Sequence, residues 1–126
     1  GLRKLEIERV AIMATYPVEI ADRLRQFLTD EGFDVVNVHA LDIISGWDAG
    51  RLPANSMKEA IKKADDANAQ AIVVPDTAIP TLHYLEEVEA ELGKPVVSAN
   101  QATLWKAVRL AGSPLSPKGF GRLWSV

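Results

Sequence analysis

Four short runs of apolar, largely β-branched residues alternate along this chain with segments whose apolar residues recur at helical spacing. After the first run, Ile20, Leu24 and Phe27 follow at offsets of four and seven, which is typical of one helix face. Strict alternation of strands and helices favours a parallel sheet with helices on both faces, because parallel neighbours need a helical crossover. We therefore predict an α/β three-layer sandwich with a four-stranded parallel sheet in the flavodoxin-like order 2-1-3-4. The predicted strands are Val10 to Ala14, Phe33 to Val38, Ala71 to Val74 and Pro95 to Val97.

Glycine and proline mark where the predicted helices begin and end. Pro17 stands where a first-turn proline belongs. The third helix is predicted from the spacing that begins at Leu82. Helix ends are predicted at three glycines placed as C-caps, Gly32, Gly93 and Gly112.

The second helix and the tail carry weaker signals. Asn55 or Ser56 is expected to cap the helix that follows them. The segment from Ser45 to Gly50 is predicted as a loop because it is rich in polar residues and glycine. The tail from Ser113 to Val126 is predicted to lie across the domain as an irregular cover.

Length and charge limit what the chain can be. Its 126 residues suffice for a single α/β domain spanning residues 1–126 and are too few for two. A net charge of -3 provides no basic surface for nucleic acid, and no apolar run approaches the roughly 20 residues needed to cross a membrane. The N-terminus lacks the apolar core of a signal peptide, so we expect a cytoplasmic protein. Gly1 in place of methionine suggests a processed or cloned boundary, and we expect a longer natural protein.

The chain contains no cysteine. This excludes disulfides, thiolate metal sites and cysteine catalysis together. His39 and His83 each stand alone without metal-ligand spacing, and no glycine-rich phosphate loop or Gly-x-Ser-x-Gly elbow occurs. The sequence therefore predicts neither a metal nor a cofactor.

Polar residues follow each predicted strand. The carboxyl ends of parallel strands share one edge of the sheet, where helix N-termini present free N–H groups and a partial positive charge. This edge suits a carboxylate ligand, although Ser, Thr, Asp and Asn also serve there as simple helix caps. The residues gathered there are Thr15 and Tyr16, His39 to Asp42, Asp76 and Thr77, and Ser98 to Gln101.

Asp76 is the most informative of these residues, because an acidic group directly after a buried strand is rarely placed there for solvation. It is either a functional carboxylate or a cap or turn aspartate. Tyr16 is either a donor to a bound anion or a half-buried aromatic with a solvated hydroxyl. The glutamates of the third helix are expected to form a solvated face: Glu86, Glu87, Glu89 and Glu91.

Several segments in order resemble one enzyme family. Thr15 to Glu19 is similar to a Pro-Tyr-Pro-x-Glu motif with threonine in place of the first proline, and Gly32 to Val36 resembles Gly-Phe-x-Val. Asp76-Thr77 falls on Cys-Thr, and Thr81 falls on the threonine that follows. The chain thus resembles the C-terminal lobe of the maleate cis-trans isomerase and arylmalonate decarboxylase branch of the Asp/Glu racemase superfamily. Glu89 to Ser98, Asn100 to Trp105 and Gly119 to Leu123 also fit.

The resemblance implies an isomerase, decarboxylase (lyase) or racemase-like protein that needs no cofactor and acts on a small mono- or dicarboxylic acid. Such enzymes have two similar lobes with the active site between them, so it implies a second lobe or subunit as partner, or a homo-oligomer. It places Asp76 at the position of the catalytic cysteine. It also implies that Tyr16 binds a substrate carboxylate and that the Thr77 N–H stabilises an enediolate oxygen. The other implied substrate-binding residues are Thr15, Thr81, Ser98 and Asn100.

Aspartate changes the chemistry that this position can support. A thiol has an ordinary pKa near 8.5 and forms a soft nucleophile, whereas a carboxyl group titrates near 3.9 and forms a hard one. A carboxylate cannot supply thiolate addition to a double bond, but it can act as a weak base next to a substrate carboxylate. Two hypotheses follow: a catalytic lobe with Asp76 in the cysteine position, or a non-catalytic domain that binds a small acid or another subunit.

Overall fold

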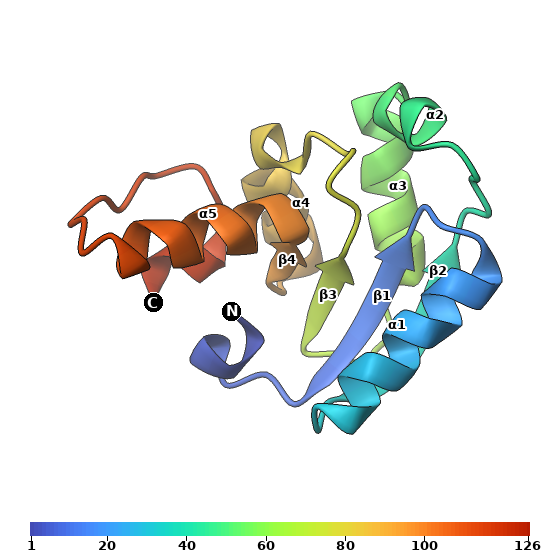
Figure 1. Ribbon diagram of the computed structural model, residues 1–126, viewed down its shortest axis with the longest axis horizontal. Helices are drawn as coiled ribbons and strands as arrows, with labels where there is room; N and C mark the ends of the chain where they lie inside the picture. Colours follow the sequence, from blue (N-terminus) through green and yellow to red (C-terminus); the bar gives the residue numbers. More distant parts are fainter.

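The computed structural model describes all residues from 1 to 126 and contains one four-stranded sheet. Its strands are all parallel and lie in the order β2-β1-β3-β4, which confirms the predicted α/β fold and strand order (Figure 1). β1 is central and pairs Val10 with both Val35 and Ala71. The strands are β1 (Arg9–Ala14), β2 (Asp34–Ala40), β3 (Ala71–Val74) and β4 (Val96–Ser98).

Helices connect the strands and cover both faces of the sheet. The α-helices are α1 (Val18–Asp30), α2 (Gly46–Gly50), α3 (Ala54–Ala64), α4 (Leu85–Leu92) and α5 (Ala99–Leu110). Three short 3-10 helices complete the chain: η1 (Leu2–Leu5), η2 (Thr81–His83) and η3 (Arg122–Ser125). None of these helices is long and apolar enough to cross a membrane.

The sheet separates two apolar cores, as a three-layer sandwich requires. On one face Ile72 and Val74 pack with residues of α3 and α4, such as Ile61 and Leu85. On the other face Ala71 belongs to the core beneath α1. Successive residues of a strand point to opposite faces, so a strand covered on both sides reads as an unbroken apolar run.

A third apolar cluster lies under α5. Trp105 of α5 packs there with Val97 of β4 and with Leu123 and Trp124 of the tail. The tail therefore closes over the domain as predicted, but it ends in η3 rather than in irregular chain. The N-terminal η1 packs against the same cluster, and both termini lie beside α5 (Figure 1).

The structure corrects several predicted boundaries. Pro17 immediately precedes α1 instead of lying in its first turn. Pro53 occupies the N-cap of α3, where its fixed φ favours helix entry, so neither Asn55 nor Ser56 caps it. The segment from Ser45 to Gly50, predicted as a loop, contains the short helix α2.

The start of the third helix is also later than predicted. Leu82 and His83 belong to η2, which is separated from α4 by Tyr84. The glycine ends are correct: Gly32 and Gly93 follow their helices with φ of +89° and +70°, values that glycine adopts without the strain of a Cβ atom.

Glu89 does not belong to a solvated helix face. Its side chain is 2% exposed, and its two carboxylate oxygens accept hydrogen bonds from the backbone N–H groups of Val96 and Arg122, each at 2.8 Å. The position looks solvated in sequence because its neighbours are charged. In the fold, its two oxygens provide acceptors for N–H groups of β4 and of the tail.

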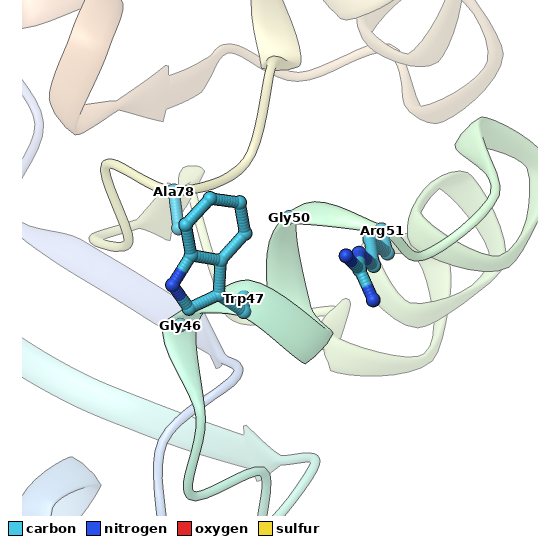
Figure 2. A pocket seen from close by; sticks show the side chains of 5 residues that line it. All are labelled: Gly46, Trp47, Gly50, Arg51 and Ala78. Carbon is cyan, nitrogen blue, oxygen red and sulfur yellow. The ribbon is translucent and has the colours of Figure 1, made fainter.

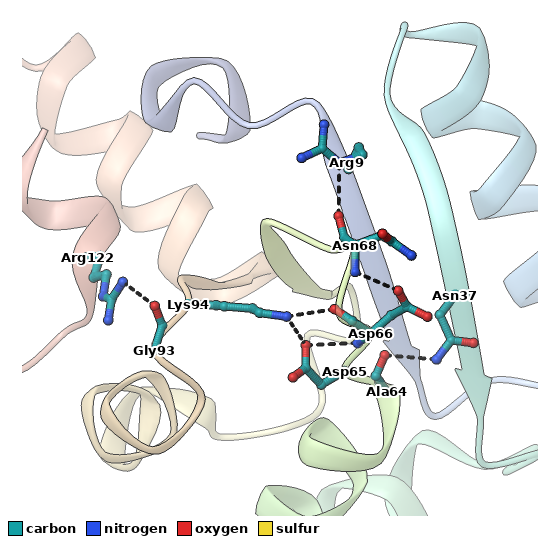
Figure 3. A network of polar contacts seen from close by, with 9 residues as sticks. All are labelled: Arg9, Asn37, Ala64, Asp65, Asp66, Asn68, Gly93, Lys94 and Arg122. Atoms are coloured by element: carbon teal, nitrogen blue, oxygen red, sulfur yellow. Dashed lines mark hydrogen bonds and ion pairs between the residues drawn. The ribbon is translucent and has the colours of Figure 1, made fainter.

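A polar network ties the loops together at the amino end of the sheet (Figure 3). Lys94 Nζ lies 2.6 Å from Asp65 Oδ1 and donates to the carbonyl oxygen of Asp66 at 2.6 Å. Arg9 Nε donates to the carbonyl oxygen of Asn68, which precedes β3. These contacts stabilise the end of the domain opposite the candidate site.

Candidate functional site

The carboxyl edge of the sheet holds a cavity of about 330 Å³. Thr15 and Tyr16 enter it from the end of β1, and Asp76 enters from the loop after β3. The segment after β2 runs beside them, because the Ile43 N–H donates to the Thr15 carbonyl at 2.8 Å. Apolar side chains supply much of the remaining wall: Pro17, Ile20, Ile43, Ile44 and Ala49.

Asp76 lies at the inner side of this cavity, with 7% of its surface exposed. Its Oδ2 accepts a hydrogen bond from the Thr15 hydroxyl, and its Oδ1 accepts one from the Ala78 N–H at 2.8 Å. The second bond is typical of an aspartate that stabilises its own turn. Asp76 is thus a turn residue that also lines a cavity, and the two interpretations left open by the sequence are compatible.

Tyr16 is half-buried beside Asp76. Partial burial, and next the negative charge of Asp76, raise the pKa of the Tyr16 phenol above its usual value. Both effects disfavour the phenolate. Tyr16 therefore keeps its proton and can donate a hydrogen bond into the cavity.

Thr81 and Ser98 come together outside the cavity. Both are buried, and the Thr81 hydroxyl donates to Ser98 Oγ at 2.8 Å. Ser98 Oγ also accepts from the Gln101 N–H at 3.2 Å, which makes Ser98 the N-cap of α5. The capping interpretation of Ser98 is confirmed.

Thr77 and Asn100 lie at the loop that follows Asp76. Asn100 Nδ2 donates to the carbonyl oxygens of Thr77 and Ile79, at 3.1 and 3.0 Å. The Thr77 N–H makes no backbone hydrogen bond within the chain. It is therefore free to bind an oxygen of a ligand.

A second cavity of about 530 Å³ adjoins the first at Gly46 (Figure 2). It is lined by α2 and the loop after β3, with the indole of Trp47 and the guanidinium of Arg51 at its sides. The Arg51 guanidinium lies 5.8 Å from the centroid of the Trp47 ring. A Cβ atom at Gly50 would lie 3.1 Å from the Ala78 carbonyl oxygen, so glycine permits α2 to approach that loop.

Sequence reasoning missed this second cavity because it treated residues 45–50 as a loop. The available signal was a pair of glycines four residues apart around a tryptophan, followed by arginine. The histidines lie elsewhere: His39 lines a separate groove between β2 and α3, and His83 is exposed on η2. No group of three or more metal-binding side chains occurs in the chain.

Comparisons with known proteins identify the family of the chain. A family model described as arylmalonate decarboxylase matches residues 1–124. The chain is 31% identical to maleate isomerase of Nocardia farcinica, over 98% of this chain and 49% of that protein. It is 33% identical to arylmalonate decarboxylase of Bordetella bronchiseptica, over 98% of this chain and 53% of that protein.

Solved structures show the same relationship. A cysteine-to-serine variant of Nocardia farcinica maleate cis-trans isomerase, with a covalently bound succinylcysteine intermediate, matches with a TM-score of 0.93 at 30% identity, over 98% of this chain and 51% of that one. Arylmalonate decarboxylase matches with a TM-score of 0.90 at 33% identity, over 99% of this chain and 56% of that one.

Two differences accompany the similarity. The chain spans about half the length of the curated relatives it matches. It contains no cysteine, whereas the intermediate seen in the Nocardia isomerase is attached to one. Since the family model covers nearly the whole chain, the chain belongs to the arylmalonate decarboxylase family, which the sequence resemblance predicted.

Proposed function

We propose that this chain forms one half of a cofactor-independent enzyme that transfers a proton at the carbon next to a carboxylate of a small acid. The observation that carries the proposal is Asp76, a buried carboxylate that lines the cavity at the carboxyl edge of the sheet. The family provides the substrate class, since its named members act on maleate and arylmalonates.

Proton transfer is the chemistry that an aspartate supports here. In a racemase-type step, the Asp76 carboxylate removes the proton next to the substrate carboxylate, and the electron pair moves onto that carboxylate to form an enediolate. A proton then returns to the carbon, from Asp76 on the same face or from a group of the proposed partner on the opposite face. In a decarboxylase-type step, the bond to one carboxylate breaks, carbon dioxide leaves, and the carboxylic acid form of Asp76 returns a proton to carbon. Isomerisation through covalent addition is not proposed, because a carboxylate is a poor nucleophile toward a double bond.

The reaction develops negative charge on the substrate carboxylate, and the chain offers two donors close to Asp76 in the fold or in the sequence. The protonated Tyr16 hydroxyl and the free Thr77 N–H can both bind an enediolate oxygen. Donors fixed before the reaction stabilise a developing oxyanion without rearranging, which contributes strongly to catalysis. The Arg51 guanidinium in the adjoining cavity supplies a positive charge for a substrate carboxylate, which offsets the negative charge of Asp76.

The second half of the proposed enzyme would cover this edge. Ile20, Ile44 and Trp47 are exposed by 43%, 91% and 79%, and all three line the two adjoining cavities. An apolar cluster of this kind at a cavity mouth is typical of an interaction surface. We propose a second lobe, or a second copy of this chain in a homo-oligomer, as the partner.

One observation favours a second candidate function, a domain that binds a small acid or another subunit without catalysis. Both oxygens of Asp76 already accept hydrogen bonds from within the chain. A carboxylate held in this way can have a purely structural role in its turn. In that case Tyr16, Thr77 and Arg51 would bind an acid that undergoes no reaction.

Deuterium exchange distinguishes the two candidates. The natural full-length protein is incubated with phenylmalonate or phenylacetate in D2O, and mass spectrometry measures carbon dioxide loss and deuterium at the carbon next to the carboxylate. We expect incorporation by the wild-type protein and a loss of at least 100-fold in Asp76→Asn, since general acid–base groups contribute about 10²–10⁴-fold. Thr103→Val, an exposed substitution on α5, is the control. Equal incorporation by the wild-type and Asp76→Asn proteins would remove Asp76 from the mechanism.

A further inference from the structure

Three hydrogen bonds reach the turn that carries Asp76 from outside, one from Thr15 after β1 and two from Asn100 of α5, and a fourth closes the turn from within. We propose that Thr15 and Asn100 are positioning residues that hold this turn, and that neither contacts the substrate. This inference rests on the proposed function in one respect: the position of Asp76 affects catalysis only if Asp76 transfers the proton. The resemblance to the family instead assigned both side chains to substrate binding.

Thr15 holds the carboxylate from the side of β1. It is 1% exposed, and its hydroxyl donates to Asp76 Oδ2. A hydroxyl has one hydrogen to donate, so Thr15 cannot also donate to a substrate oxygen while this bond exists. The bond joins residues 61 positions apart in sequence and links the ends of neighbouring parallel strands.

Asn100 holds the backbone of the turn from the side of α5. Its amide nitrogen donates to the carbonyl oxygens of Thr77 and Ile79, which flank Ala78 in sequence. The N–H of Ala78 in turn donates to Asp76 Oδ1 at 2.8 Å. An amide nitrogen has two hydrogens, so both are already engaged by the loop.

Thr15 and Asn100 together fix the orientation of the Asp76 carboxylate and of the peptide groups beside it. Thr15 orients one carboxylate oxygen, Ala78 orients the other, and Asn100 fixes the peptide groups around Ala78. The Thr77 N–H lies within the same held segment and keeps no partner of its own. Small displacements of catalytic groups reduce rates strongly. We call the contacts of Thr15 and Asn100 with this turn the brace, and we infer that the brace holds Asp76 more precisely than its loop alone would.

Tyrosine titration reports the charge that lies beside Tyr16, provided that circular dichroism shows each variant to remain folded over the titrated pH range. The chain has only two tyrosines, and burial raises the pKa of Tyr84 to about 12. The titrations are therefore made in a Tyr84→Phe background, which leaves Tyr16 as the one phenol that titrates. Part of the raised pKa of Tyr16 comes from the charge of Asp76. If the brace holds that charge beside Tyr16, breaking the brace lowers the Tyr16 pKa.

The experiment compares Thr15→Val and Asn100→Ala with the wild-type chain, using ultraviolet titration of Tyr16 and hydrogen exchange of the Ala78 amide. We expect a lower Tyr16 pKa in Thr15→Val and at least ten-fold faster Ala78 exchange in Asn100→Ala. Thr15→Ser, which keeps the hydroxyl, should restore wild-type values. Thr103→Val and Asn55→Ala, both at exposed helix positions, are the matched controls.

Two outcomes would overturn the proposal. One is wild-type values of Tyr16 pKa and Ala78 exchange in both variants. The other is a loss of phenylmalonate affinity of ten-fold or more with an unchanged Ala78 exchange rate, since this identifies a direct substrate contact. The proposed function can fail without affecting this test. The Tyr16 pKa and the Ala78 exchange rate can still be measured if the wild-type protein is inactive or if Asp76→Asn is fully active. If the protein is active, Thr15→Val and Asn100→Ala should each lower kcat and leave KM within about two-fold of the wild-type value.

Discussion

The buried side chain of Glu89 connects α4 to both β4 and the C-terminal tail. Its carboxylate accepts hydrogen bonds from Val96 of β4 and Arg122 of the tail. Burial raises the pKa of Glu89, and the hydrogen bonds from the two N–H groups oppose that effect only in part. The folded state therefore holds a proton on Glu89 more tightly than the unfolded state does.

This difference in pKa predicts a pH dependence of stability. A raised folded pKa means that the contribution of protonated Glu89 is fully present below the ordinary pKa of 4.5 and is lost as the pH rises through the folded value. We expect the free energy of unfolding of the wild-type chain to fall as the pH rises from 4.5 through the folded pKa of Glu89. In Glu89→Gln the same free energy should depend less on pH over this range. Urea denaturation at several pH values measures it, with the exposed Glu8→Gln as the control. An identical pH profile for wild-type and Glu89→Gln proteins would contradict the prediction.

Gly121 lies against the same carboxylate. It has φ +83°, and a Cβ atom there would lie 2.7 Å from Gln101 Nε2 and 3.0 Å from Glu89 Oε1. Gly112 has φ +64° but no atom within 4 Å of the equivalent position. We expect Gly121→Ala to destabilise the chain by about 1–3 kcal/mol more than Gly112→Ala, because only the former adds overpacking to backbone strain. Thermal unfolding of both variants tests this, and equal losses would show that strain alone acts.

At the level of the element, α2 decides what the candidate site can recognise. It is five residues long, and its glycines allow it to lie against the loop after β3. This places Trp47 and Arg51 beside a cavity that shares Gly46 with the Asp76 cavity. An acid with an apolar body would meet an indole surface, a guanidinium and the hydroxyl of Tyr16.

Replacement of Arg51 should therefore weaken acid binding. An exposed charge-assisted hydrogen bond contributes about 1 kcal/mol, which is roughly five-fold in affinity. We expect Arg51→Gln to lose about that much affinity for phenylmalonate, measured by calorimetry. Arg23→Gln, an exposed arginine on α1, should bind as the wild-type chain does. If both variants bind alike, Arg51 does not contact the acid.

For the whole molecule, the central fact is that this chain spans about half the length of its curated relatives. Exposed apolar residues lie at the carboxyl edge, and under our proposal a second lobe or a second copy of the chain covers this surface. A proton-transfer site between two halves needs groups from both, because orientation and oxyanion stabilisation provide much of the rate.

The 126-residue chain alone should accordingly show no maleate isomerase activity. Asp76→Cys should not restore activity by itself, because under our proposal orienting and oxyanion-binding groups from a second lobe, or from a second copy of the chain, are needed as well. The assay follows conversion of maleate to fumarate, with a full-length maleate isomerase as the positive control. Turnover by the wild-type chain would show that Asp76 supports the isomerisation after all. Turnover by the variant alone would show that one lobe, as a homodimer, builds the site.

Much of the fold follows from local patterns in the sequence. A buried strand such as Ala71 to Val74 is apolar throughout, an amphipathic helix repeats near 3.6 residues, and Gly32 and Gly93 end helices by adopting positive φ. These signals depend on residues within a few positions of one another. Local patterns therefore predict the alternation of strands and helices, and the general preference for right-handed crossovers then favours the strand order 2-1-3-4. The absence of cysteine excludes thiol chemistry.

Only the tertiary structure decided which polar side chains work together. The Thr15 hydroxyl meets Asp76 across 61 residues, and Glu89 meets Arg122 across 33. In the sequence Glu89 resembles a solvated residue, because polarity alone does not reveal a partner. The contacts of Thr15 with Asp76 and of Asn100 with the loop after Asp76 have no local signal either. Each pairing depends on β1 and β3 being neighbours, or on the tail crossing α4, and no local periodicity encodes such contacts.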